Sequence, residues 1–208
     1  MILFWKLYST YIKIKESFRQ MSTKATKGEF SYLQQKKKQE ILKTVLFFGI
    51  SIAIFFLGYF STGSKNNMLT VIAVLGCLPA SKSAVSMIMN LKIKGCSEEV
   101  HEKLIQEVGS DIGCYNLYFT SYDKNFDITH LFVKGLTIIA FTENSKAEET
   151  VFEEHLKKML KNDGINGYHV KLYKDLSKYI TRMKQMQQTE SEKGKEDDVI
   201  KTLYAVSL

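Results

Sequence analysis

Residues 44–60 read TVLFFGISIAIFFLGYF and belong to the longest uncharged run in the sequence. No charged residue occurs between Thr44 and Ser64, and Phe, Ile and Leu occupy every side of a helix drawn through it. A helix of about 20 apolar residues crosses a hydrocarbon core of about 30 Å. A long core helix of a soluble protein normally keeps a polar face, which this stretch lacks. The stretch therefore predicts a membrane-spanning helix.

A second uncharged run follows after a short polar connection. It reads NNMLTVIAVLGCLPAS over residues 66–81 and, after Lys82, continues as SAVSMIMNL to residue 91. The two runs predict an antiparallel transmembrane hairpin over residues 41–93. Lys82 falls about 16 residues into the second helix, roughly 24 Å along it, where its long side chain can reach the far interface. The alternative is that Pro79 and Lys82 serve a transport complex, to which this chain would be an accessory subunit.

Lysines flank the hairpin at the ends away from the connecting loop, which carries only Lys65. The residues expected to anchor the hairpin at the membrane surface are Lys36, Lys37, Lys38, Lys43, Lys82, Lys92 and Lys94. Because Lys and Arg in short segments beside a span stay on the cytoplasmic side, both termini are predicted to be cytoplasmic.

Small residues recur at four-residue spacing in both runs. Those expected at helix-packing positions are Gly49, Ala53, Gly76, Ala80 and Ala84. Such spacing lets helix backbones approach closely in lipid. It fits either packing of the hairpin on itself or formation of a homo-oligomer, and the sequence does not separate the two.

The positive charge lies at the N-terminal side of the chain. Residues 1–43 carry a net charge of +7 and residues 44–94 carry +4, whereas residues 95–208 carry −4. The overall charge of +7 is therefore no sign of nucleic-acid binding, and no nucleic-acid partner is expected. Residues 1–40 are interpreted as a basic cytoplasmic segment. Its first twenty residues form either an interfacial amphipathic helix or a stretch upstream of a true start at Met21.

Residues 95–187 predict a small cytoplasmic α+β domain. Its expected elements are a helix at 98–108 capped by Ser97, strands at 115–122, 128–133 and 136–141, a helix at 146–161, a strand at 168–173 and a helix at 175–187. Residues 188–208 are interpreted as a polar linker followed by an apolar tail.

The order α-β-β-β-α-β-α resembles, in topology only, the core of the restriction-endonuclease-like superfamily. That resemblance implies a divalent cation held by an Asp of the second strand and by a Glu-x-Lys pair of the third. Asp127 matches the first position, but residues 136–144, LTIIAFTEN, contain no Glu-x-Lys, and Glu143 comes only after the strand. The pattern favours either a degenerate nuclease-like core or an unrelated α+β fold. Asp127, Glu143 and Lys134 are the candidate catalytic residues of the alternative, a divergent hydrolase.

No other motif indicates catalysis. The sequence contains no glycine-rich phosphate loop and no paired Cys or His at zinc-ligand spacing, so no metal and no cofactor are expected. His130 and His169 fall on predicted strands, where a structural histidine is commoner than a general base.

The amino-acid sequence of the hairpin shows a second resemblance. Residues 66–89, NNMLTVIAVLGCLPASKSAVSMIM, together with FSYLQQKKKQEIL at 30–42, resemble a set of uncharacterised two-helix membrane proteins of anaerobic Gram-positive bacteria. The resemblance implies a bacterial plasma membrane and this architecture, and it carries over no catalytic residue. Because a predicted hairpin accompanies a folded domain without an assembled acid, base, metal or nucleophile set, we expect a non-enzymatic membrane-anchored adaptor. Its expected partners are the lipid bilayer and an unidentified cytoplasmic protein.

Overall fold

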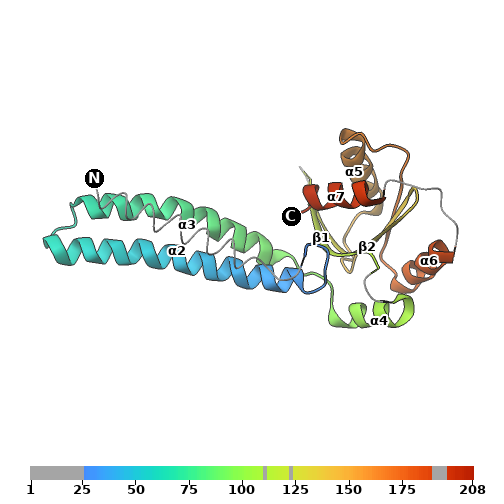
Figure 1. Ribbon diagram of the computed structural model, residues 1–208, viewed down its shortest axis with the longest axis horizontal. Helices are drawn as coiled ribbons and strands as arrows, with labels where there is room; N and C mark the ends of the chain where they lie inside the picture. The colour runs from blue at the N-terminus through green and yellow to red at the C-terminus, as the bar shows by residue number, and fades with distance from the viewer. Residues whose placement is uncertain (1–25, 110–111, 122–123, 189–195) are drawn as a thin grey trace. The chain divides into compact units, whose positions relative to one another are not determined.

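The computed structural model describes residues 26–109, 112–121, 124–188 and 196–208. It is an α+β protein in which two long apolar helices precede a small four-stranded mixed sheet with helices around it (Figure 1). The described residues divide into a helical hairpin, Gln34–Lys92, and a globular unit made of Thr26–Leu33 and Ile93–Leu208. The helix expected in residues 1–20 lies outside the described residues.

The hairpin consists of helices α2, Tyr32–Thr62, and α3, Met68–Lys92. Both are long and apolar enough to cross a membrane, and in each only 17% of the most apolar window is buried. Helix α2 begins earlier than the hydrophobic pattern indicates, because the polar residues 34–40 continue the same helix. Most of these polar residues, Gln and Lys, have good helix propensity.

The hairpin buries small and hydroxyl-bearing side chains and exposes large apolar ones. Thr44, Ser51 and Gly58 repeat every seven residues along the buried face of α2. The buried residues of α3 are Ala73, Ala80, Ser83 and Asn90. The exposed apolar residues include Val45, Ile52, Phe56, Leu57, Phe60, Val71, Val74, Leu75, Leu78 and Val85. This polarity is the reverse of a soluble helical hairpin and is typical of helices packed in lipid.

The structure divides the predicted packing residues between the hairpin interface and an exposed face. Ala80 is fully buried, and a Cβ atom added at Gly76 would lie 2.8 Å from Ser51 Oγ, so these two residues do pack the hairpin. Gly49 and Ala53 instead lie on the exposed face of α2, and a Cβ added at Gly49 would meet nothing within 4 Å. Ala84 is half-buried. Four-residue spacing places residues on one face, but the seven-residue stripe decides which face meets α3.

The globular unit contains one mixed sheet of order β1-β2-β3-β4. Its strands are β1, Cys114–Thr120; β2, Asn125–Lys134; β3, Thr137–Phe141; and β4, His169–Tyr173. The first three form an antiparallel meander, and β4 runs parallel to β3 after a crossover through a helix. Its helices are α4, Glu98–Val108; α5, Glu149–Asn162; α6, Leu176–Gln188; and α7, Glu196–Val206.

Helices cover both faces of the sheet (Figure 1). On one face, α5 and α7 contribute Phe152, Leu156 and Leu203, each of them fully buried. On the other, α4 and α6 contribute Leu104, Tyr179 and Met183. The sheet is thus the middle of three layers, and its apolar strands have to be hydrophobic on both faces.

Two predicted helix starts are confirmed. Ser97 has extended backbone angles, and its Oγ accepts the backbone N–H of Val100 at the start of α4. The Asp175 carboxylate accepts the N–H groups of Ser177 and Lys178 at the start of α6. Both are N-caps, which satisfy helix donors that have no partner within the helix.

The expected tail at 188–208 is wrong, because residues 196–206 form helix α7. Its Val199 and Leu203 are fully buried, and Ser207 bridges to Phe119 beside β1. The acidic run that suggested a linker supplies Glu196, Asp197 and Asp198 to the first turn, where the helix dipole favours negative charge. The two buried residues, four apart, then dock the helix on the sheet.

Candidate functional site

Asp127 and Glu143 lie at the same end of neighbouring strands. Asp127 is near the start of β2, and Glu143 follows the end of β3, which runs antiparallel to β2. Their carboxylates hold one segment of backbone: Asp127 Oδ2 accepts the N–H of Lys94 at 2.9 Å, and Glu143 Oε1 accepts the N–H of Ser97 at 3.0 Å. The segment between these two residues links α3 to α4. Both candidate carboxylates therefore have a structural partner.

Lys134 lies at the other end of β2. It is seven residues from Asp127, which corresponds to about 23 Å along a strand. Its Nζ donates to the carbonyl of Gln187, near the end of α6, at 2.8 Å. The structure therefore brings two of the three predicted residues to one end of the sheet and leaves the third at the opposite end.

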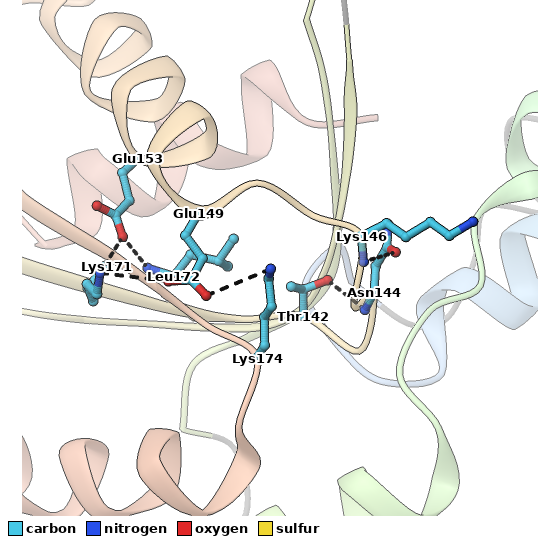
Figure 2. Close-up of polar contacts among 8 residues, drawn as sticks. All are labelled: Thr142, Asn144, Lys146, Glu149, Glu153, Lys171, Leu172 and Lys174. Carbon is cyan, nitrogen blue, oxygen red and sulfur yellow. Dashed lines mark hydrogen bonds and ion pairs between the residues drawn. The ribbon is translucent and has the colours of Figure 1, made fainter.

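The loop that follows β3 is held by short-range polar contacts (Figure 2). Thr142 Oγ1 donates to the carbonyl of Asp127 at 2.6 Å and accepts the N–H of Asn144 at 3.1 Å. Asn144 Oδ1 in turn accepts the N–H of Lys146 at 3.1 Å. Figure 2 also shows the nearby lysines of the β4 region, Lys171 and Lys174, lying against carboxylates of α5. These cations are occupied by ion pairs within the domain.

Asn116 is a structural residue that sequence reasoning missed. Its side-chain Oδ1 accepts the N–H of Cys96 at 2.6 Å, and its Nδ2 donates to the carbonyl of Phe30 at 2.9 Å. One buried amide thus ties the chain leading into α2 and the chain leaving α3 to strand β1. Asn116 has a φ of 59°, a left-handed conformation that Asn tolerates better than most residues. That tolerance is the only signal in the sequence.

The two strands change faces at this position. Cys114 pairs with Leu131 and Leu117 pairs with Ile128, in one continuous register. All four side chains nevertheless belong to the same core. In a regular strand, residues 114 and 117 would point to opposite faces of the sheet, because they are three residues apart. The left-handed Asn116 produces the switch in β1, and Thr129 lies opposite it in β2. Thr129 Oγ1 accepts the N–H of Glu143 at 3.1 Å, so the irregularity also anchors the loop after β3.

His130 is buried and fully hydrogen-bonded. Its Nε2 is 2.9 Å from the carbonyl of Ile112, which can only accept, so Nε2 carries the proton. Its Nδ1 then accepts from the hydroxyl of Tyr179 at 2.7 Å. Burial lowers the pKa of His130 to about 4 and raises the pKa of Tyr179. His130 is therefore a neutral structural residue, as the sequence indicates, and His169 is exposed on β4.

A pocket of about 560 Å³ lies beside this network. Its walls include Phe30, His101, Ile105, Tyr115 and Tyr204. The rings of Phe30 and His101 stack in parallel with centroids 3.8 Å apart, and Tyr115 meets His101 edge-on at 5.1 Å. Burial lowers the pKa of His101, so its ring is neutral at pH 7. Glu29 also lines the pocket and is exposed to solvent.

The floor of the pocket is fixed by contacts to helix α7. Lys27 Nζ donates to the carbonyls of Tyr204 and Ser207, both at 2.6 Å, where the helix dipole favours a cation. Gly28 has a φ of 99°, and a Cβ added to it would lie 2.0 Å from the hydroxyl of Tyr204. Only glycine fits there. The pocket is therefore formed by three segments that are distant in sequence, residues 26–31, 101–115 and 204. For this reason no linear motif predicts it.

Nucleophilic and metal chemistry find little support in the described part of the chain. Burial and the nearby Glu143 carboxylate raise the pKa of the Cys96 thiol to about 12, so the thiolate that a cysteine nucleophile needs does not form near pH 7. Among the described residues, no group of three His, Cys, Asp or Glu side chains could hold a metal ion.

Comparisons with known proteins add no family to this picture. Neither a protein-family model, nor a curated protein, nor a solved structure matches the chain.

Proposed function

We propose that this chain is a membrane-anchored adaptor. The hairpin crosses a bacterial plasma membrane twice, both termini are cytoplasmic, and the globular unit binds a protein partner without catalysing a reaction. The inside-out polarity of the hairpin supports insertion, because large apolar side chains such as Phe56 and Leu78 are exposed while hydroxyl groups such as Ser51 are buried. The flanking lysines support a cytoplasmic position for the globular unit.

One observation carries the non-enzymatic part of the proposal. The carboxylates of Asp127 and Glu143 accept backbone N–H groups of Lys94 and Ser97. A hydrolase of the nuclease-like kind would need both carboxylates to bind a cation, with a lysine beside them to orient the attacking water. Lys134, the third candidate, is bound at the far end of β2. In this arrangement the two candidate carboxylates hold the segment that connects α3 to α4.

The aromatic pocket is the surface we assign to the partner. Pockets that bind ligands are concave and mostly apolar, with a few polar groups that fix orientation. Here the rings of Phe30, Tyr115 and Tyr204 form the walls and the exposed Glu29 adds a negative charge. Lys27 also lines the pocket, with its ammonium directed to carbonyls of α7. Aromatic faces beside a carboxylate suit a cationic side chain. A lysine or arginine of the partner protein is therefore the expected occupant.

Site-specific photo-crosslinking of the full chain in native membranes tests this assignment. A photo-reactive residue replaces Ile105, which lines the pocket and is 39% exposed, and a matched control replaces Leu136, which is 38% exposed in the β2–β3 turn. We expect a discrete crosslinked protein from position 105, and its loss when Glu29 is changed to Lys. Equal crosslinking at both positions, or none at position 105, would show that the pocket is not the docking site.

Assays of hydrolysis test the non-enzymatic part. The full chain, purified in detergent, is incubated with DNA, RNA and phosphodiester model substrates in the presence of Mg²⁺ or Mn²⁺. We expect no turnover above that of an Asp127→Asn variant. Metal-dependent turnover that the Asp127→Asn substitution abolishes would replace the adaptor proposal with the hydrolase alternative.

A further inference from the structure

One packing register runs along the whole hairpin. Thr44 Oγ1 and Ser83 Oγ are 3.1 Å apart. Seven residues further along α2, Ser51 packs against Gly76, and a Cβ added at Gly76 would lie 2.8 Å from Ser51 Oγ. After another seven residues Gly58 packs against Leu69, and a Cβ added at Gly58 would lie 2.8 Å from Leu69 Cβ. Each step of seven along α2 is thus matched by a step of seven back along α3. This register fixes the level of every residue of one helix relative to the other.

The register places two lysines at nearly the same level of the hairpin. Ser83 lies opposite Thr44, so Lys82 lies opposite Val45, and Lys43 is only two residues from that level, or about 3 Å. From Lys43 and Lys82 to the connecting loop, neither helix contains a charged residue. The two lysines therefore mark the same end of one uncharged band.

This band is shorter than a typical bilayer core. Lys82 is 14 residues from Met68, which corresponds to about 21 Å, and Val45 is 17 residues from Thr62, which corresponds to about 26 Å. The hydrocarbon core of a typical bilayer is about 30 Å thick. A short span is accommodated by thinning of the bilayer and by long side chains that extend to the interface. The four-carbon side chain of Lys82 suits that role.

A second tier of lysines lies further along both helices. Lys36, Lys37 and Lys38 precede Lys43 by five to seven residues, or about 8 to 10 Å. The same register places Leu91 opposite Lys36, so Lys92 falls at this tier. The headgroup layer of one leaflet is about 5 to 8 Å thick. The two tiers are therefore spaced to bracket one layer of headgroups. Glu40, the one acidic residue of the hairpin, lies between them and pairs with Lys43 at 2.9 Å, so it cancels one of the six positive charges.

We propose that these residues form a two-tier lysine collar, made of Lys43 and Lys82 in the first tier and Lys36, Lys37, Lys38 and Lys92 in the second. The collar binds the phosphate groups of anionic lipids in the cytoplasmic leaflet and sets a shortened membrane span. This inference rests on the proposed membrane insertion. It assigns Lys82 to the membrane interface. The charge of Lys82 then no longer favours a role for Pro79 and Lys82 in a transport complex.

The test measures lipid retention and insertion separately. The full chain is reconstituted in nanodiscs of phosphatidylglycerol and phosphatidylcholine, extracted gently, and weighed by native mass spectrometry to count retained anionic lipids. The test variant is Lys43→Gln/Lys82→Gln. The matched controls are Lys43→Arg/Lys82→Arg, which keeps both charges, and Lys65→Gln, which removes a charge from the loop at the other end.

We expect the double Gln variant to bind phosphatidylglycerol about 25-fold more weakly, because a lysine near an anionic surface contributes about fivefold, equivalent to about 1 kcal/mol. Lys43→Arg/Lys82→Arg should bind as the unaltered chain does, and Lys65→Gln should bind at most about fivefold more weakly, because it removes a single lysine. Retention by the double Gln variant equal to that of Lys65→Gln would overturn the collar while leaving the anchor intact. Extraction of the unaltered chain from membranes by alkaline carbonate would instead overturn membrane insertion itself.

The length of the span gives an independent readout. In bilayers of short-chain lipids the hairpin should be most resistant to thermal unfolding, because the uncharged band then matches the hydrocarbon thickness. Maximal resistance in long-chain lipids would contradict the assignment of Lys82 to the interface.

Discussion

Replacement of Asn116 separates the energy of its side-chain contacts from the energy of its backbone conformation. In Asn116→Gly the positive φ of 59° is retained at no steric cost, and only the amide contacts to Cys96 and Phe30 are lost. In Asn116→Ala the same contacts are lost and a left-handed conformation is imposed on a residue with a Cβ, which costs about 1 kcal/mol more. The pair of variants therefore isolates both quantities.

The magnitude follows from burial. Asn116 is 7% exposed, and each lost hydrogen bond leaves a backbone group that the packed segment keeps from water. A net hydrogen bond contributes about 1 kcal/mol, and an orphaned buried partner costs about 1 to 3 kcal/mol. We expect the free energy of unfolding to fall by about 2 to 4 kcal/mol for the Gly variant and by about 3 to 5 kcal/mol for the Ala variant.

Urea denaturation of the full chain in detergent, followed by the near-ultraviolet circular dichroism of tyrosine, measures both values. Asn166→Ala is the control, because Asn166 is exposed and its replacement should change the free energy of unfolding by less than about 0.5 kcal/mol. If Asn116→Gly is as stable as that control, the amide does not fasten the two connecting segments. If the Ala and Gly variants are equal, the left-handed conformation carries no strain.

Three further predictions concern the sheet and its covering helices. The pKa of His130 is about 4 in the folded state and about 6.5 when unfolded, so the unfolded state binds a proton first as pH falls. The chain should therefore lose about 3 kcal/mol of stability between pH 6.5 and 4. Denaturation at several pH values should show this loss for the native chain and not for His130→Asn. Glu153 Oε1 accepts the N–H of Leu172 on the outer edge of β4 at 3.1 Å, so Glu153→Ala should speed hydrogen exchange of that amide by about tenfold, and an unchanged rate would refute this contact. Leu203→Ala should lower the free energy of unfolding by about 2 to 5 kcal/mol, while Lys201→Ala, on the exposed face of α7, should have little effect; equal effects would mean that α7 is not part of the core.

Local signals in the sequence predicted most helices and strands of the globular unit. Ser97 predicts the start of α4, because a side-chain acceptor before an amphipathic run satisfies the first helix donors. Lys134-Gly135 predicts the β2–β3 turn, where Gly135 adopts a φ of 57°. Helix α7 was missed because its acidic first turn continues a polar run. Its buried Val199 and Leu203 become interpretable only once the sheet that they cover is known.

The candidate site was less predictable than the fold. Sequence order placed Asp127 at the start of the second strand and Glu143 after the end of the third, as in the structure. Which groups their carboxylates bind depends on where residues 93–97 pass the sheet. Lys134 lies in the same strand as Asp127 but at its opposite end, so the length of the strand separates the two side chains. The role of Asn116 could not be derived, because it requires residues 30 and 96 to meet at one point of β1, and no periodicity encodes such a meeting.

The contribution of residues 26–33 to the globular unit constrains how the protein is made. These residues leave the ribosome before the hairpin, yet their partners Tyr115, Asn116 and Tyr204 are synthesised after it. The unit therefore cannot complete its folding until both helices and the sheet that follows them have been translated. An early segment that waits in this way makes the order of synthesis differ from the order of folding: until strand β1 has been made, the carbonyls of Gly28 and Phe30 lack the donors of Tyr115 and Asn116.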